Sequence, residues 1–126
     1  MILQRWDTVL SDVKELYFDT IIHDEHLRIS LKDGHNNQYE LFLRYANVYA
    51  YKVSDEEILT DYWNVKKKQI GHSFIVKDSE WCSQIITCNV GEQPQHYVIA
   101  TWGFCVEILT EENLNMGLAN FRVDIF

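Results

Sequence analysis

The stretch HLRISLK, residues 26–32, alternates polar and apolar side chains at every position. Leu27, Ile29 and Leu31 fall on one side of this pattern, and the polar residues fall on the other. Successive side chains of a β-strand point to opposite faces of a sheet, so a period of two is typical of a strand with one buried face. The first third of the chain is therefore predicted to consist of strands.

Similar patterns on both sides of this strand predict an antiparallel meander. The HDE sequence at 23–25 predicts a tight turn, and DGHNN at 33–37 predicts another, because Gly and Asn tolerate a positive φ. A bulge or bend is expected near Ala46–Asn47, where the alternation loosens. The apolar residues expected to share faces are Leu16, Phe18 and Ile22 in the first strand, Tyr39, Leu41 and Leu43 in the third, and Tyr49, Tyr51 and Val53 beyond Asn47.

Two short helices are predicted after the meander. Ser54 followed by Glu57 forms a capping-box pattern, and the acidic residues between them suit the positive end of a helix dipole. This helix is expected to be short, because the basic run KKK follows at 66–68. Ser79 is the expected N-cap of the second helix, in SEWCSQIIT. HSFIVKD, which lies between the two helices, is predicted to be a strand.

The stretch QHYVIATWGFCVEIL, residues 95–109, predicts a β-hairpin with Trp102 and Gly103 as a two-residue loop. In that register Ala100 lies opposite Cys105, Val98 opposite Glu107, and His96 opposite Leu109. One face is nearly all apolar and is predicted to face the core: Tyr97, Ile99, Thr101, Phe104, Val106 and Ile108. The other face carries His96, Val98, Ala100, Cys105, Glu107 and Leu109.

These elements predict an α+β fold in a single domain that spans residues 1–126. One antiparallel sheet is expected, built from the N-terminal meander and the C-terminal hairpin and packed with the two short helices. The final stretch EENLNMGLANFRVDIF fits either a short helix or a last strand in FRVDIF.

The charge of the chain bears on its partners. It has 19 acidic and 11 basic residues, which gives a net charge of -8. Such a surface repels nucleic-acid backbones and anionic membranes, so neither is expected as a partner, and it suits a basic protein. The three cysteines have no CxxC spacing and the N-terminus lacks a long apolar segment. The protein is therefore predicted to be cytoplasmic, with free thiols.

The hairpin places a histidine, a cysteine and a glutamate close together in the sequence. His96 lies about 13 Å along the strand from the residue opposite Cys105, too far for a nucleophile and its base. His96 and Glu107 are diagonal neighbours within hydrogen-bonding reach, but no third member of a catalytic group is visible. We therefore predict a structural role for this pair, no catalytic residue and no enzyme activity.

No metal or cofactor site is predicted either. HDEH at 23–26 offers two histidines at best, whereas a zinc site needs three or four converging ligands. The chain contains no Gly-rich phosphate loop and no dinucleotide-binding or zinc-protease motif.

Aromatic residues are abundant, with four tryptophans and seven tyrosines. Trp and Tyr are frequent anchors of protein interfaces. Trp102 is notable because a hairpin turn normally carries a small or polar residue. The residues predicted to bind a partner combine such aromatic side chains with nearby carboxylates: Trp102, Tyr62, Trp63, Asp55, Glu56 and Asp61.

The chain resembles small acidic bacterial immunity proteins of polymorphic and contact-dependent-inhibition toxin systems. The resemblance rests on the meander LRISLKDGHNNQYELFLRYANVYAYKV, the helix start DSEW and the hairpin HYVIATWGFCVEIL. It implies a cytoplasmic protein that binds and blocks one cognate toxin, and it implies no particular site residue. Two alternatives stay open: a small enzyme or ligand-binding domain with a pocket near His96, Glu107 and His72, and an oligomeric adaptor.

Overall fold

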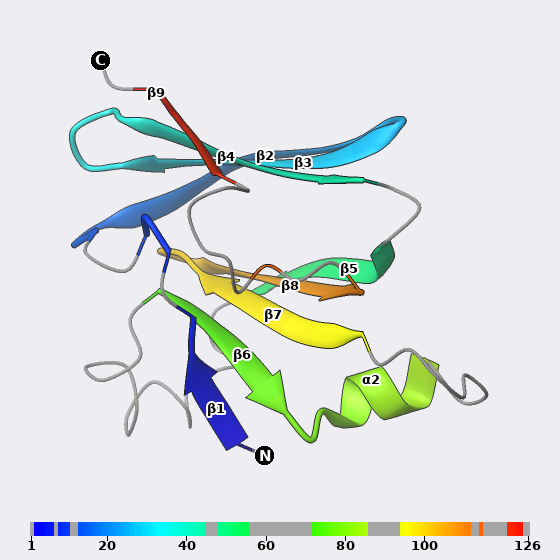
Figure 1. Ribbon diagram of the computed structural model, residues 1–126. Coiled ribbons are helices and arrows are strands. Elements are labelled where there is room, and N and C mark those ends of the chain that lie inside the picture. The colour runs from blue at the N-terminus through cyan, green and yellow to red at the C-terminus, as the bar shows by residue number, and fades with distance from the viewer. Residues whose placement is uncertain are drawn as a thin grey trace.

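Two antiparallel β-sheets lie face to face in the computed structural model of the chain (Figure 1). The structure describes residues 2–6, 8–10, 13–44, 48–55, 72–85, 94–111, 114 and 121–124. The strands are β1 (Ile2–Arg5), β2 (Leu16–His23), β3 (His26–Asp33), β4 (Gln38–Arg44), β5 (Val48–Asp55), β6 (Ser73–Lys77), β7 (Gln95–Ala100), β8 (Phe104–Thr110) and β9 (Phe121–Asp124). The helix α2 spans Glu80–Ile85.

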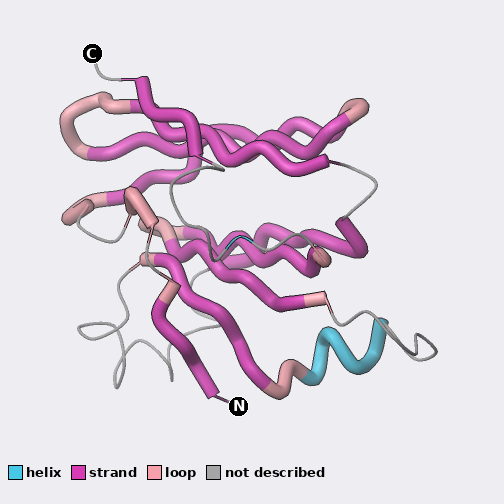
Figure 2. Tube along the Cα trace, viewed as in Figure 1, coloured by secondary structure: helices cyan, strands magenta, loops and turns pink. Residues whose placement is uncertain are grey.

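The predicted α+β class is wrong, because the fold is mostly β. A five-stranded sheet has the order β1-β6-β7-β8-β5, and a four-stranded sheet has the order β2-β3-β4-β9. Figure 2 shows the strands in two layers, with the helix of the described residues on the side of the five-stranded sheet that faces away from the other sheet. The expected single sheet is thus two sheets.

The meander is confirmed for β2, β3 and β4, which pair in sequence order. Leu27, Ile29 and Leu31 of β3 are buried, as the alternation predicted. The C-terminal stretch supplies β9, which pairs with β4 and completes this sheet. The ambiguity of FRVDIF is resolved in favour of a strand over Phe121–Asp124.

Register shifts overturn two of the predicted faces. The pairing of β2 with β3 shifts between Phe18 and Thr20, so Ile21 packs against the core and Ile22 is 46% exposed. The pairing of β5 with β8 shifts between Val48 and Ala50, and Tyr49 is exposed. An extra residue in a strand moves every later side chain to the opposite face, which the sequence pattern alone did not reveal. The bend expected at Ala46–Asn47 lies outside the described residues.

The predicted helix start at Ser54 is also wrong. Ser54 and Asp55 belong to β5 and lie opposite Cys105 and Phe104 of β8. Ladder pairing with a central strand therefore outweighs the local capping-box signal at this position. The rest of that predicted helix, residues 56 onward, lies outside the described residues.

The main core fills the space between the two sheets. Trp6 links it to the chain beyond β8, because its indole N–H donates to the Leu114 carbonyl at 2.7 Å and its ring lies 4.8 Å from that of Tyr97. The Leu114 N–H in turn donates to the Tyr97 hydroxyl. The other buried members of this core are Leu10, Leu16, Leu27, Ile29, Leu31, Tyr39, Leu41, Leu43, Ile75, Ile99, Val106 and Ile108.

The predicted β7–β8 hairpin is confirmed, including its register. Gly103 has a φ of 87°, a conformation that glycine adopts without steric cost. The face predicted to point to the core does so through Tyr97, Ile99, Val106 and Ile108. The prediction is wrong for Phe104, which is 46% exposed next to the hairpin loop. The opposite face is buried as well, and Val98, Ala100 and Cys105 form a second apolar cluster with Phe74 and Val76.

Asp33 organises the turn between β3 and β4. Its carboxylate accepts hydrogen bonds from the backbone N–H groups of His35 and Asn37, from the Asn37 side chain and from the Tyr39 hydroxyl. Burial favours the neutral acid, but these four donors outweigh it and lower the pKa of Asp33 to about 2.

Replacing Asp33 by Ala should destabilise the protein by about 1–3 kcal/mol at neutral pH, because the buried Tyr39 hydroxyl and three part-buried donors lose their acceptor. Since the folded-state pKa is lowered, this contribution is present above about pH 4 and is lost as the pH falls toward about 2. Urea unfolding of the wild type and Asp33→Ala over that range tests both statements. Asp24→Ala is the control, because Asp24 is an exposed carboxylate that accepts the His26 backbone N–H in the β2–β3 turn; an equal loss in the two variants would contradict the assignment.

Candidate functional site

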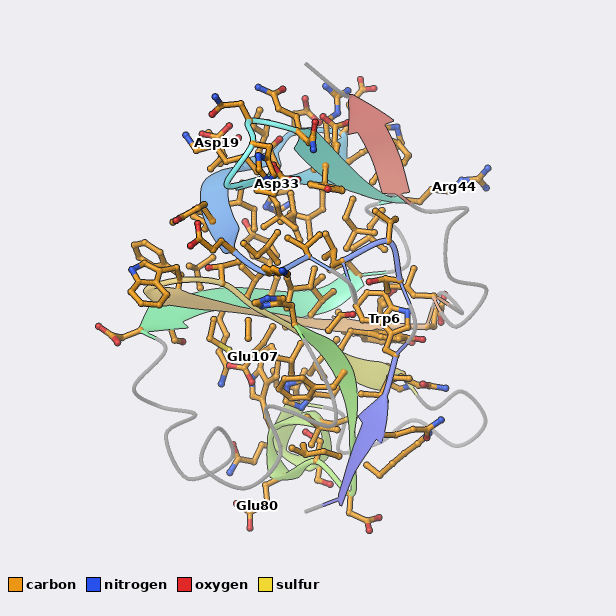
Figure 3. All side chains as sticks on the ribbon, turned by 90° about the vertical axis from the view of Figure 1, so that its left-hand side faces the viewer. Trp6, Asp19, Asp33, Arg44, Glu80 and Glu107 are labelled. Carbon is orange, nitrogen blue, oxygen red and sulfur yellow. The ribbon has the colours of Figure 1, made fainter. Side chains whose placement is uncertain are left out.

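A chain of three hydrogen-bonded polar side chains lies on the outer face of the five-stranded sheet. The Ser79 Oγ is 2.7 Å from His96 Nδ1, and His96 Nε2 is 2.9 Å from Glu107 Oε1. All three residues are at least nine-tenths buried. Figure 3 shows Glu107 below the five-stranded sheet, on the side where α2 lies. We call Ser79, His96 and Glu107 the relay.

The hairpin register places two members of the relay. His96 and Glu107 lie on neighbouring strands of the hairpin, on the face opposite the main core, because Tyr97 and Val106 beside them point into that core. The predicted diagonal hydrogen bond between His96 and Glu107 is confirmed. It is buried inside the fold, whereas a pair at the rim was expected.

Ser79 enters the relay from the junction between β6 and α2. Asp78 has a positive φ of 55°, which turns the chain sharply after β6 and sets Ser79 before the first turn of the helix. The Cys82 N–H donates to the Ser79 Oγ at 3.1 Å, so the predicted N-cap is confirmed. The same hydroxyl thus caps α2 and meets His96.

The direction of the hydrogen bonds follows from the chemistry of each group. An ionised Glu107 only accepts, so for a neutral imidazole the proton lies on His96 Nε2. Nδ1 then carries a lone pair and accepts the proton of the Ser79 hydroxyl. The order is Ser79 O–H to imidazole and imidazole N–H to carboxylate, which is the order of groups in a serine-hydrolase triad.

Lys52 and Trp81 support the carboxylate end and the ring of the relay. The Lys52 Nζ is 3.5 Å from Glu107 Oε2 and 4.3 Å from the centre of the Trp81 ring. Trp81 also packs edge-on against His96, with ring centres 5.1 Å apart. Burial raises the pKa of Glu107, but the hydrogen bond from His96 and the charge of Lys52 outweigh it, so the pKa lies below its usual value.

Cys105 does not compete as a nucleophile. Burial, together with the nearby charge of Glu107, raises the pKa of its thiol to about 12, so the thiol stays protonated at neutral pH. It lies opposite Ala100, as the hairpin register predicted. His72 is also separate from the relay, because its Nδ1 donates to the Ala100 carbonyl at 3.0 Å.

The histidines of HDEH have different neighbours. His23 Nδ1 lies 2.8 Å from the Tyr51 hydroxyl, and the His26 ring packs against Phe42. Within the described parts of the chain, no group of three or more His, Cys, Asp or Glu residues is placed to hold a metal ion.

The residues predicted to bind a partner are placed only in part. Trp102 is 71% exposed at the hairpin tip, and exposed Asp55 ends β5 opposite Phe104. Phe104 is 46% exposed and packs against Phe18 with ring centres 5.6 Å apart. We call Trp102, Phe104 and Asp55 the tip surface. Tyr62, Trp63, Glu56 and Asp61 lie outside the described residues.

Ser79 is the member of the relay that sequence reasoning missed. The sequence marked Ser79 as a helix cap, which the structure confirms, but gave no sign of its contact with His96. Nothing local indicates that Ser79 lies beside His96, which is seventeen residues further along the chain. The pairing of β6 with β7 places Val76 opposite His96 and so brings the two together.

A cavity of about 630 Å³ lies elsewhere, at the Asp33 turn. Its lining comes from the segment before β2 and from the β3–β4 turn, and it shares no residue with the relay: Val9, Val13, Lys14, Glu15, Asp33, Gly34, His35 and Tyr39. The Asp33 carboxylate in this lining already accepts four hydrogen bonds within the turn.

Comparison of the chain with protein-family models, curated proteins and solved structures finds no match. Within the part of the chain that the structure describes, no helix is long and apolar enough to cross a membrane.

Glu107→Gln should change how stability depends on pH. The folded-state pKa of Glu107 is lowered, so its contribution is present above about pH 4.5 and is lost as the pH falls through the folded value. At neutral pH the variant should be less stable by about 1–3 kcal/mol, because the charge-assisted hydrogen bond with His96 is lost. Urea unfolding at several pH values should show that the difference from wild type shrinks in acid.

The matched control is Asp19→Asn, because Asp19 is an exposed carboxylate far from the relay (Figure 3). It should leave both the stability and its pH dependence nearly unchanged. A constant difference between Glu107→Gln and wild type at every pH would show that the carboxylate charge contributes nothing.

Proposed function

We propose that this protein is a cytoplasmic binding module that neutralises a basic protein toxin by covering its active surface. The observation that carries the proposal is Trp102, a tryptophan that is 71% exposed at the tip of a regularly paired hairpin. Large aromatic side chains that protrude from a rigid support are typical anchors of protein interfaces. The resemblance to immunity proteins supports the same class of function.

The backbone around Trp102 is fixed by several hydrogen bonds. The Trp102 N–H donates to the Leu16 carbonyl at 2.7 Å, which ties the tip to β2 of the other sheet. The Thr101 N–H and hydroxyl both donate to the Phe104 carbonyl. A side chain presented by a fixed backbone loses less conformational entropy on binding, and this favours affinity.

The surroundings of Trp102 fit a basic partner. Phe104 extends the apolar area, and Asp55 adds a carboxylate beside it. The net charge of -8 attracts a positively charged surface over a longer range. Binding of this kind works by occlusion, so it requires no chemistry at the interface.

Trp102→Ala should weaken binding of the partner by about 30-fold or more, because interface tryptophans commonly contribute about 2 kcal/mol or more. Tagged wild type and variant are incubated with native cytosol and culture medium at low salt, and the basic protein released by salt is identified. Its affinity for each variant is then measured with purified components, together with inhibition of its toxic activity.

Ile22→Ala is the matched control, because Ile22 is another exposed apolar residue, in the edge strand of the four-stranded sheet. It should bind like wild type. Asp55→Asn should mainly slow association and flatten its salt dependence. Equal affinity of wild type and Trp102→Ala for the captured partner would place the interface elsewhere.

A further inference from the structure

We infer that the relay is an acyl-transfer site in which Ser79 is the nucleophile for an uncharged carboxylic ester. This activity is separate from the proposed binding function. His96 lies six residues before Trp102, about 20 Å along an extended strand, so the pair of Ser79 and His96 is well separated from Trp102 at the tip. Either function can therefore fail without the other.

The distances of the relay are those that nucleophilic catalysis needs. A serine hydroxyl is a weak nucleophile until an adjacent base accepts its proton, and this requires a contact of about 2.6–3.2 Å. The 2.7 Å between Ser79 Oγ and His96 Nδ1 meets this requirement. Glu107 then orients the ring from the other side at 2.9 Å and stabilises the imidazolium that forms.

The environment keeps each group in the state that the reaction needs. The lowered pKa of Glu107 keeps its carboxylate ionised, and Lys52 adds a positive charge next to it. Trp81 packs on His96 and restricts the movement of the ring. The capping N–H of Cys82 binds a lone pair of the Ser79 Oγ, which directs the hydroxyl proton toward His96.

Ser79 also lies close to the molecular surface. About a twelfth of the Ser79 surface, 8%, is exposed to solvent, and its neighbours Asp78 and Glu80 are both exposed. Glu80 points outward from α2 in Figure 3. These two carboxylates repel anionic molecules, and Trp81 provides an apolar side chain near Ser79, so the substrate class is an uncharged ester.

The reaction balances with water as the only co-reactant. Ser79 Oγ forms a bond to the ester carbonyl carbon and its proton passes to His96 Nδ1. The tetrahedral intermediate collapses, the bond to the alcohol oxygen breaks, and this oxygen takes the proton from His96. Water then attacks the acyl-serine with His96 as base, which releases the carboxylic acid and restores the Ser79 hydroxyl.

The first test is labelling of the wild-type protein with an alkyl fluorophosphonate, followed by mass spectrometry. Ser79 Oγ should form a bond to phosphorus and expel fluoride, giving one adduct per chain on the peptide that contains Ser79. A short-chain p-nitrophenyl ester should give a burst of p-nitrophenol, and prior labelling should abolish it. A folded wild-type protein that gains no adduct at Ser79 overturns the inference, whatever the outcome for partner binding.

Two variants separate catalysis from architecture. His96→Gln should slow labelling by about 100-fold or more, because the general base is lost. Glu107→Gln should slow it at least about tenfold, as expected for a positioning residue. Circular dichroism and thermal unfolding establish that each variant is folded at the labelling temperature. If His96→Gln does not fold, the test rests on Glu107→Gln alone. Labelling of either folded variant at the wild-type rate overturns the inference.

Ser83→Ala is the matched control for the nucleophile. Ser83 lies in α2 four residues after Ser79, is exposed, and donates its hydroxyl to the Ser79 carbonyl and not to a histidine ring. This variant should label and release p-nitrophenol like wild type, whereas Ser79→Ala should do neither. Adducts that appear equally on Ser83 and Ser79 would show nonspecific reaction and overturn the inference.

Discussion

The two central strands β7 and β8 are buried on both faces, and the rest of the fold is arranged to satisfy this constraint. A strand with two apolar faces needs cover on both sides, because exposed apolar area is costly. The four-stranded sheet covers one face through the main core. On the other face, Val98, Ala100 and Cys105 are buried in the second apolar cluster, and Trp81 of α2 packs against His96.

Because this face is buried, the polar groups on it lose their hydration, which raises the free energy of the folded state unless they find partners. A carboxylate that is 6% exposed, like that of Glu107, is tolerated only where hydrogen bonds and an opposite charge replace water. His96 and Lys52 supply them, and Ser79 satisfies the remaining nitrogen of His96. Satisfying this buried acid thus produces the order of groups that a nucleophilic site uses. The hairpin therefore carries an aromatic tip at its loop and, further along its strands, the His96 and Glu107 members of the relay.

Prediction from the sequence succeeded where local rules act. The two-residue loop at Trp102 and Gly103 determined the hairpin register, and that register was enough to predict the contact between His96 and Glu107. The cap at Ser79 marked the start of α2 correctly. Prediction from the sequence failed for the capping-box pattern at Ser54, because the neighbouring strand β8 offered β5 a ladder of backbone hydrogen bonds. Local signals of about 1 kcal/mol do not compete with such pairing.

The sequence by itself determined the strands with strict alternation, the turns that contain Gly or Asn, and the start of α2, since each depends on residues a few positions apart. Only the tertiary structure decided that β5 leaves the meander for the other sheet, that Ile22 faces outward, and that Ser79 reaches His96. These outcomes depend on which strands pair over long separations and on where a register shifts. Alternating patterns are compatible with many such pairings. The pairing that forms is the one that buries the apolar faces of all the strands together.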